Sequence, residues 1–276
     1  MRKQNLHTHS TYCDGKDSLE EMISFAIEKD FQSIGFSSHC YSGLSFDDCG
    51  IKTKDKYYEY LNELTELKTK YQGKIEIFKG VELESRTSDA LFPAKDKALD
   101  YAIGSVHWFY LDNRCWAIDY KPEVFQEAEN AFGGKRRLLE SYYEEISKFA
   151  SSSDYDILGH IDLVTKFSER MNWDFESYSW YRDAAISALE CAIKHDKFIE
   201  VNTGAISRGY RTSPYPAPFL LKRIKELNGK VILTSDCHNK NNLECFFKES
   251  LDLLASYNIT QLYFLTKDGF IGEKIK

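Results

Sequence analysis

The residues best suited to chemistry begin with two histidines near the start of the chain, His7 and His9, in the segment Leu6-His7-Thr8-His9. Side chains two residues apart in a β-strand point to the same face, so this spacing would present two imidazoles side by side. Imidazole is a common metal ligand, and a shared ion needs several such donors close together. The pair alone is only suggestive, because two polar residues also occur together at strand ends without binding anything.

The elements that would position these side chains follow an alternating β/α pattern. We expect strands ending near residue 9 and over 33–39, 74–84, 101–107, 155–160, 198–202 and 230–238, with a further strand over 261–266. Helices are expected over 18–29, 54–71, 138–149, 180–195, 218–227 and 243–257, the first opened by the capping box Ser18-Leu-Glu-Glu21. Residues 108–135 form an irregular insertion in this scheme. The alternation predicts a parallel sheet with helices outside, and seven or eight such units can close into an α/β barrel.

The candidate metal ligands stand at or just beyond the C-terminal ends of these strands. Six of the seven histidines do so, and the exception, His195, ends a helix. In an α/β barrel all these strand ends meet on one face. The cluster has too many nitrogen and oxygen donors for one tetrahedral zinc, so it predicts two or three divalent ions, for which zinc, iron and manganese are all compatible. The candidates are His7, His9, His39, Glu82, His107, His160, Asp236 and His238, while the sixth strand offers Asn202 instead.

Length and composition limit the other classes of function. The 276 residues suffice for one barrel and show no repeat or linker, so we predict a single domain over 1–276. A net charge of −7 argues against a nucleic-acid partner. No apolar run has the length of a membrane span, the first residues lack the apolar core of a signal peptide, and the seven cysteines contain no C-x-x-C pair, which together predict a cytoplasmic protein. The sequence leaves the oligomeric state open.

The motifs resemble those of the polymerase and histidinol phosphatase (PHP) superfamily over nearly the entire chain. They are His7-Thr-His9-Ser, Ser38-His39, Gly80-Val-Glu82, Gly104-Ser-Val-His107, Gly159-His160 and Ser235-Asp236-Cys-His238. The long insertion after His107 and the segment Glu200-Val-Asn202-Thr-Gly look like the monofunctional histidinol-phosphate phosphatases of that superfamily. The resemblance implies a distorted seven-stranded (β/α) barrel and hydrolysis of L-histidinol phosphate to L-histidinol and phosphate, a step of histidine biosynthesis.

The same resemblance implies a trinuclear metal centre. One ion would be held by His7, His9, Glu82 and Asp236, a second by the bridging Glu82 with His107 and His160, and a third by Asp14, His39 and His238. Some members of the superfamily have histidine where this chain has Asp14. That residue otherwise reads as a turn residue before Gly15.

Metals in this arrangement suit the hydrolysis of a small phosphate ester. Two close divalent ions lower the pKa of a shared water, so hydroxide bridging the metals would be the nucleophile, with Glu82 and Asp236 as catalytic ligands. The loop after the sixth strand supplies Arg208 and Arg211 for the phosphoryl oxygens, and Asn202 is a further candidate contact with the substrate. The general acid and the group that binds the substrate amine remain unassigned.

Three alternatives stay open. A PHP-type phosphoesterase could act on a nucleotide or another small phosphate ester, although the acidic net charge weighs against an exonuclease. An amidohydrolase-like barrel also begins with H-x-H, but it typically relies on a bridging lysine from a middle strand, whereas here the third strand brings the carboxylate of Glu82. A metal-binding protein without activity would have no need for the arginine loop. A metal content near three ions per chain would favour a PHP-type phosphoesterase, and a content near two would favour an amidohydrolase-like barrel.

Overall fold

Parallel strands form the framework of the molecule. The computed structural model describes residues 2–44, 47–85, 96–111, 114–152 and 154–275. One sheet has the order β1 (Gln4–Asn5), β2 (Ser33–Phe36) and β3 (Glu76–Lys79). The other has the order β10 (Val231–Thr234), β9 (Phe198–Asn202), β8 (Ile157–Leu158), β5 (Ile103–Ser105) and β4 (Glu82–Glu84). Every neighbouring pair in both sheets is parallel, which confirms the predicted α/β class.

The two sheets approach each other through isolated parallel bridges just beyond their strands. Thr8 bridges Cys237, and the backbone N–H of His9 donates to the Cys237 carbonyl at 3.0 Å. At the other side His39 bridges Glu82, and the N–H of Cys40 donates to the Glu82 carbonyl at 2.9 Å. The predicted strand over 74–84 is thus divided into β3 and β4. The bridged segments are the same ones that carry several candidate ligands.

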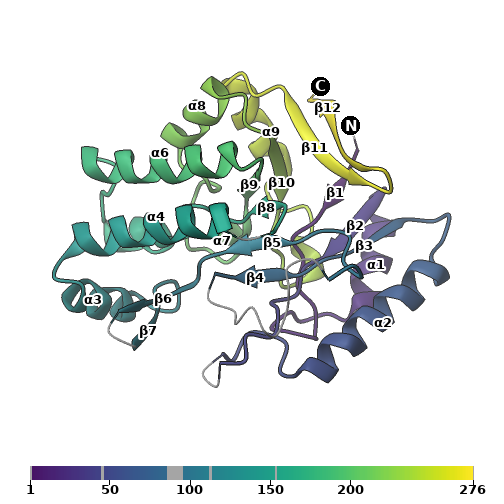
Figure 1. The fold of residues 1–276 in the computed structure, drawn as a ribbon. Helices are drawn as coiled ribbons and strands as arrows, with labels where there is room; N and C mark the ends of the chain where they lie inside the picture. Colours follow the sequence, from purple (N-terminus) through teal and green to yellow (C-terminus); the bar gives the residue numbers. More distant parts are fainter. Residues whose placement is uncertain (1, 45–46, 86–95, 112–113, 153, 276) are drawn as a thin grey trace.

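The six helices expected from the sequence are present and flank the strands (Figure 1). They are α1 (Leu19–Glu28), α2 (Lys54–Lys70), α4 (Lys135–Ser152), α6 (Ser179–Lys194), α8 (Pro218–Glu226) and α9 (Phe247–Ser256). Ser18 and Glu21 form the expected capping box of α1. His195 is the exposed C-cap of α6, away from the other histidines as predicted. None of the described helices is both long and apolar enough to cross a membrane.

The expectation of an irregular insertion over 108–135 is wrong for most of that segment. It contains the antiparallel hairpin β6 (Trp108–Leu111) and β7 (Arg114–Ala117), followed by α3 (Pro122–Ala131). Two side chains of α3, Phe125 and Ala128, are buried on one face and Pro122 stands at its first position, so the sequence carries a helix signal that the expectation overlooked. Phe125 packs on Trp173, with ring centroids 4.6 Å apart, and this contact with a distant segment further stabilises the helix.

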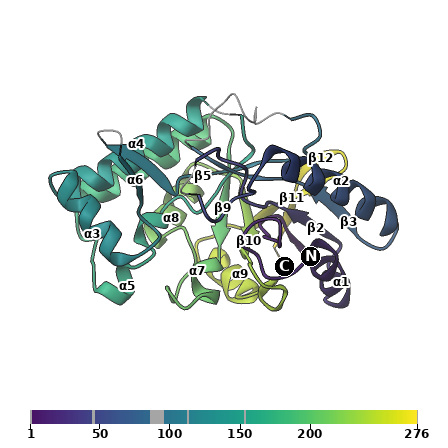
Figure 2. The same cartoon turned by 90° about the horizontal axis from the view of Figure 1, so that it is seen from below.

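The C-terminal segment forms a second hairpin outside the parallel sheets. The further strand expected over 261–266 is β11 (Gln261–Thr266), and it pairs with an unpredicted strand, β12 (Gly269–Lys274). This hairpin lies beside the start of the chain, so both termini are close together in the two views (Figures 1 and 2). The side chain of Gln4 donates to the Leu265 carbonyl at 2.8 Å, which ties β11 to β1.

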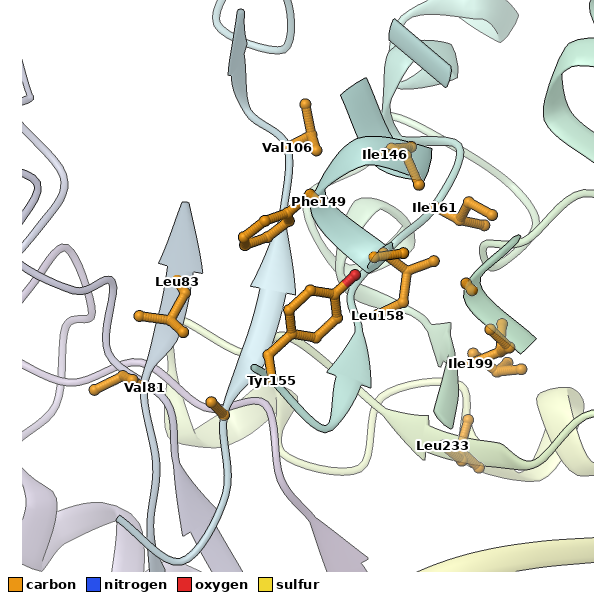
Figure 3. Close-up of a cluster of buried hydrophobic side chains, with 14 of the residues drawn as sticks. Val81, Leu83, Val106, Ile146, Phe149, Tyr155, Leu158, Ile161, Ile199 and Leu233 are labelled. Atoms are coloured by element: carbon orange, nitrogen blue, oxygen red, sulfur yellow. The ribbon is translucent and has the colours of Figure 1, made fainter. Parts of the chain in front are cut away.

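Buried apolar side chains fix the strand ends against the outer helices. Ile146 and Phe149 of α4 project toward Tyr155, just before β8, and toward Leu158 in β8 (Figure 3). The rings of Phe149 and Tyr155 lie 4.7 Å apart, and all four side chains are buried. Close packing of this kind resists small displacements. The segment that carries His160, two residues beyond β8, therefore starts from a rigid support.

The shorter helices carry loop residues toward the same end of the sheets. The 3-10 helix η1 (Leu163–Thr165) and α5 (Ser168–Met171) follow β8, and α7 (Gly204–Ser207) follows β9. A second 3-10 helix, η2 (Lys240–Asn242), follows β10. The chain therefore adds connecting structure beyond the C-terminal strand ends, where the candidate ligands stand.

Candidate metal centre

A cavity of about 350 Å³ lies at the C-terminal ends of the parallel strands. Its lining includes seven of the predicted ligands together with Arg208: Asp14, His39, Glu82, His107, His160, Asp236 and His238. His7 and His9 are fully buried against the same cluster, and the His9 ring stacks on that of His238 with centroids 4.0 Å apart. The structure therefore collects all nine predicted ligands in one place.

Donor atoms of these side chains come close enough to share ions. Four groups, each with ligand atoms within 4.8 Å of one another, could hold a metal ion. They are His9, Asp14, His39 and His238; His7, His160 and Asp236; His7, His9 and Glu82; and His39, Glu82 and His107. The groups share members, so the cluster is continuous and offers positions for more than one ion.

Glu82 lies at the centre of the cluster. Its Oε2 is 3.2 Å from Nε2 of His7 and 2.9 Å from Nδ1 of His39. Its Oε1 is 3.1 Å from Nε2 of His160 and 3.6 Å from Nε2 of His107. Oε2 also lies 3.6 Å from Nε2 of His9, so Oε1 faces two imidazoles and Oε2 faces three, an arrangement that suits a carboxylate shared between two ions.

The donor set fits divalent metal ions by an independent criterion. Three buried atoms at its centre, Nε2 of His7, Nε2 of His9 and Oε2 of Glu82, have no hydrogen-bond partner among the residues that the structure describes. Buried polar atoms without partners are rare because each loses the hydrogen bonds that water would offer. A cation between them would satisfy all three, and mixed imidazole and carboxylate donors suit zinc, iron and manganese.

Glu200 holds part of the cluster from behind. Its Oε1 lies 2.5 Å from Nδ1 of His7 and accepts a hydrogen bond from Thr234 at 2.7 Å. Its Oε2 accepts from the backbone N–H of His160 at 2.7 Å and from the side chain of Asn202 at 2.9 Å. With Nδ1–H of His7 donated to this carboxylate, the lone pair on Nε2 faces the other ligands, as in the carboxylate–histidine pairs of metal sites.

Glu84 supports His107 in the same way. Its Oε2 lies 2.8 Å from Nδ1 of His107 and also accepts the backbone N–H of that residue. We assigned no role to Glu84 or Glu200 from the sequence, yet a signal was present. Glu84 follows Glu82 by two residues, and Glu200 precedes Asn202 by two, so the strand periodicity that pairs His7 with His9 applies to both.

The electrostatics of the cluster couple an ionised carboxylate to the imidazoles around it. Burial alone would raise the pKa of Glu82, but the charges of His7 and His39 hold that pKa well below its usual value. Burial, together with the charges of His238 and His39, lowers the pKa of His9 to about 3. An ionised carboxylate therefore stands beside the neutral imidazole of His9. Although burial lowers it, the charges of nearby carboxylates, Glu82 among them, raise the pKa of His7, His39 and His107, so a bound cation would displace protons from these three rings.

Asp236 is aimed into the cavity by an uncommon backbone conformation. Its φ of 46° lies in the left-handed region, which aspartate adopts more readily than most residues. A Cβ atom at Gly204 would lie 2.7 Å from Oδ2 of Asp236, so only glycine allows this close approach. The guanidinium of Arg208 donates to the same oxygen at 3.0 Å. Asp236 thus presents one oxygen to Arg208 and the other to the histidines.

The residues predicted to contact substrate separate into two groups. Arg208 lines the cavity, whereas Arg211 is not part of the lining and donates instead to the side chain and carbonyl of Thr165. The buried side chain of Asn202 donates to Glu200 and accepts the N–H of Gly204 at 2.8 Å. These placements favour supporting roles for Arg211 and Asn202 over the predicted contact with substrate.

The cavity contains a cation that sequence reasoning missed. Lys166, just after η1, lines it with a side chain that is 14% exposed, and its Nζ lies 3.1 Å from Oδ2 of Asp119. We use the name wall for the part of the lining made by Trp108, Ala117, Asp119, Tyr120, Lys166 and Tyr210. Lys166 stands in a short turn with no pattern of its own, and nothing in the sequence distinguishes it from the many surface lysines.

Comparisons with known proteins agree with this arrangement. The model of the PHP domain family matches residues 5–204. The histidinol-phosphatase of Bacillus subtilis is 25% identical over 268 residues, which cover 91% of this chain and 99% of that protein.

Two solved structures share the fold. A candidate histidinol phosphatase of Listeria monocytogenes superimposes with a TM-score of 0.80 at 21% identity, covering 90% of this chain and 99% of the other. The histidinol phosphate phosphatase of Lactococcus lactis, solved with zinc, L-histidinol and phosphate, gives a TM-score of 0.72 at 19% identity and covers 98% and 99% of the two chains.

Proposed function

The chain belongs to the PHP domain family, and on that premise we propose that it is a metal-dependent phosphomonoesterase that converts L-histidinol phosphate to L-histidinol and phosphate. The observation that carries the proposal is a single cavity beside the nine clustered candidate ligands, seven of which line it together with two cationic side chains, Arg208 and Lys166. Metal ions and fixed cations are what a phosphate monoester dianion requires. The similarity to named histidinol-phosphatases along nearly the whole chain supports the choice of ester.

The proposed architecture is a single domain over 1–276, a distorted seven-stranded barrel. The order of the two sheets and the bridges Thr8–Cys237 and His39–Glu82 support closure, because they join β1 to the β10 segment and β2 to the β4 segment. With β3 and β4 counted as one interrupted strand, the ring has seven members. The metal cluster then stands at the C-terminal face of the barrel, where such folds build active sites.

We assign three divalent ions to the cluster, and zinc, iron and manganese all fit the donors. The group His9, Asp14, His39 and His238 supports the site predicted for Asp14, His39 and His238. The group His7, His9 and Glu82 supports the site that also includes Asp236, and the contact between Glu82 and His160 supports the site that also includes His107. Asp14 is a ligand in this assignment rather than a turn residue alone.

The side chains in and around the cavity have separate tasks in the reaction. Bound divalent ions would lower the pKa of a water molecule and offset the charge of the phosphoryl oxygens. Arg208, held by Asp236, and Lys166, held by Asp119, bind the phosphoryl group and orient it. Glu200 and Glu84 keep protons on Nδ1 of His7 and His107, so the Nε2 lone pairs remain directed at the cluster.

Substrate specificity tests the proposal directly. The purified protein, with its metal content quantified, is assayed for phosphate release from L-histidinol phosphate and from nucleotide, sugar and aryl phosphates. We expect kcat/KM on histidinol phosphate to exceed the rest by at least about 100-fold, which corresponds to about 2.7 kcal/mol of transition-state discrimination. A flat profile with about three metals bound would retain the phosphoesterase and discard the substrate. No release from any ester would overturn the proposal.

A further inference from the structure

The proposed substrate carries an ammonium group, to which none of the roles assigned so far supplies a binding partner. Histidinol phosphate bears an ammonium on the carbon next to the phosphorylated carbon. A cation that leaves water for a partly enclosed cavity needs an anionic partner, since the loss of hydration is otherwise uncompensated. The cavity is lined by six carboxylates, Asp14, Asp47, Glu82, Glu84, Asp119 and Asp236. The partner of the ammonium should be one that has an oxygen to spare.

Three of these carboxylates belong to the metal cluster, and two more are held elsewhere. Asp14, Glu82 and Asp236 occur in the groups of candidate ligands. Glu84 accepts hydrogen bonds from the backbone and ring of His107. Asp47 is also engaged. Its oxygens accept hydrogen bonds from the N–H groups of Cys49 and Gly50 and from the hydroxyl of Ser42. Asp47 therefore organises its own turn.

Asp119 differs from all of these. It lies in the wall, two residues beyond β7, with a side chain that is 19% exposed. Lys166 donates to its carbonyl at 2.8 Å and to Oδ2 at 3.1 Å, while Oδ1 has no hydrogen bond to any residue that the structure describes. Although burial raises it, the charges of Lys166 and His107 hold the pKa of Asp119 below its usual value. The carboxylate is therefore ionised at neutral pH with one oxygen available.

We propose that Asp119 binds the ammonium group of the substrate through Oδ1 and so determines the preference for aminoalkyl phosphates. This inference rests on the proposed function. Lys166 is one of the two cations assigned to the phosphoryl group, and Asp119 is in contact with it. A carboxylate shared between a phosphate-binding lysine and an ammonium suits a substrate whose phosphate and ammonium stand on adjacent carbons. The imidazole, one carbon further away, would lie beyond this contact.

A comparison of two esters tests the role of Asp119. The esters are L-histidinol phosphate and its deamino analogue, which has hydrogen in place of the ammonium. In the wild-type protein the ammonium should raise kcat/KM, because a charge-assisted hydrogen bond is stronger than a neutral one. In Asp119→Asn we expect kcat/KM to fall about 10- to 100-fold on histidinol phosphate and to stay within about threefold on the deamino ester. The ratio of the two values does not depend on the folded fraction, and Asp119→Ser provides a second variant.

The matched control is Asp47→Asn, which neutralises another carboxylate of the lining. It should change kcat/KM on both esters by the same factor. If Asp119→Asn lowers both esters equally, Asp119 acts only through Lys166 and the inference is overturned. A larger selective loss in Asp47→Asn would also overturn it and assign the ammonium to Asp47. If the wild-type protein does not prefer histidinol phosphate to other phosphate esters, the proposed function itself fails, which is a separate outcome.

Discussion

The floor of the cavity, by which we mean the nine clustered ligands with Glu84 and Glu200, contrasts with the wall. Most floor residues stand on strands or shortly beyond their ends, whereas Asp14 lies in the turn that follows the β1 segment. Behind them Glu200 has four hydrogen-bonded partners. The wall comes from the β6–β7 hairpin, from the segment that joins it to α3 and from two further loops, and it is more open, since Tyr120 is 64% exposed. The floor is thus fixed by the sheets, whereas the wall is fixed by how inserted segments fold back onto them.

This difference separates two tasks of an enzyme. The rigid floor is suited to the hydrolysis of the phosphate ester bond, which is the same in every substrate, because catalytic groups must be held in place before the reaction. A wall of aromatic and charged side chains contacts the part of the substrate that differs from one ester to another. Changes in the floor should therefore affect all phosphate esters equally. Changes in the wall should be selective, except at Lys166, which binds the phosphoryl group that all the esters share.

The largest effect is expected for the floor residue Glu82. In Glu82→Gln the shared carboxylate loses its charge, so metal content should fall and kcat/KM should drop by about 1000-fold or more, which corresponds to about 4 kcal/mol. The loss should be the same for histidinol phosphate, its deamino analogue and ethanolamine phosphate. Metal analysis and steady-state rates on the three esters check this.

The matched control for Glu82 is Glu123→Gln, an exposed position in the first turn of α3. It should leave metal content and rates unchanged. Full metal content in Glu82→Gln would exclude Glu82 as a ligand. A loss confined to one ester would break the distinction between floor and wall.

The next largest effect on kcat/KM is expected for one of the two arginines in the loop after β9. Arg208→Ala should lower kcat/KM about 100-fold on all three esters, because it removes charge-assisted hydrogen bonds to the phosphoryl group that they share. Arg211→Ala should stay within about threefold in kcat/KM and should instead lower the melting temperature, since it releases the bonds to Thr165. Rates and thermal unfolding of both variants measure this, and equal kinetic losses would contradict the assignment.

These arginines illustrate what the sequence can specify. The strand-end histidines were predicted because residue type and strand periodicity together limit where such side chains can point. Arg208 and Arg211 are alike in type and three residues apart, yet only the first reaches the cavity. Gly209, with φ of 71°, turns the chain between them. The direction of each side chain in such a loop depends on tertiary contacts, which no local pattern contains.

The wall was predictable to a smaller extent for the same reason. Its hairpin is followed by α3, whose docking depends on the contact of Phe125 with Trp173, about 50 residues away in the chain. Lys166 belongs to the wall only because η1 returns the chain toward the strand ends. The floor needs the correct strands alone, whereas the wall needs the correct packing of segments between them.

The smallest effect concerns an aromatic residue of the wall, Trp108 at the start of β6. Trp108→Ala removes a flat apolar surface, and aromatic contacts of this kind contribute about 0.5–1.5 kcal/mol beyond buried area. We expect kcat/KM on histidinol phosphate to fall roughly two- to tenfold. Ethanolamine phosphate keeps the phosphate and the ammonium but has no imidazole, so its kcat/KM should not change. If kcat/KM falls by the same factor for both esters, Trp108 acts through the neighbouring ligand His107. This part of the wall would then have the function of the floor.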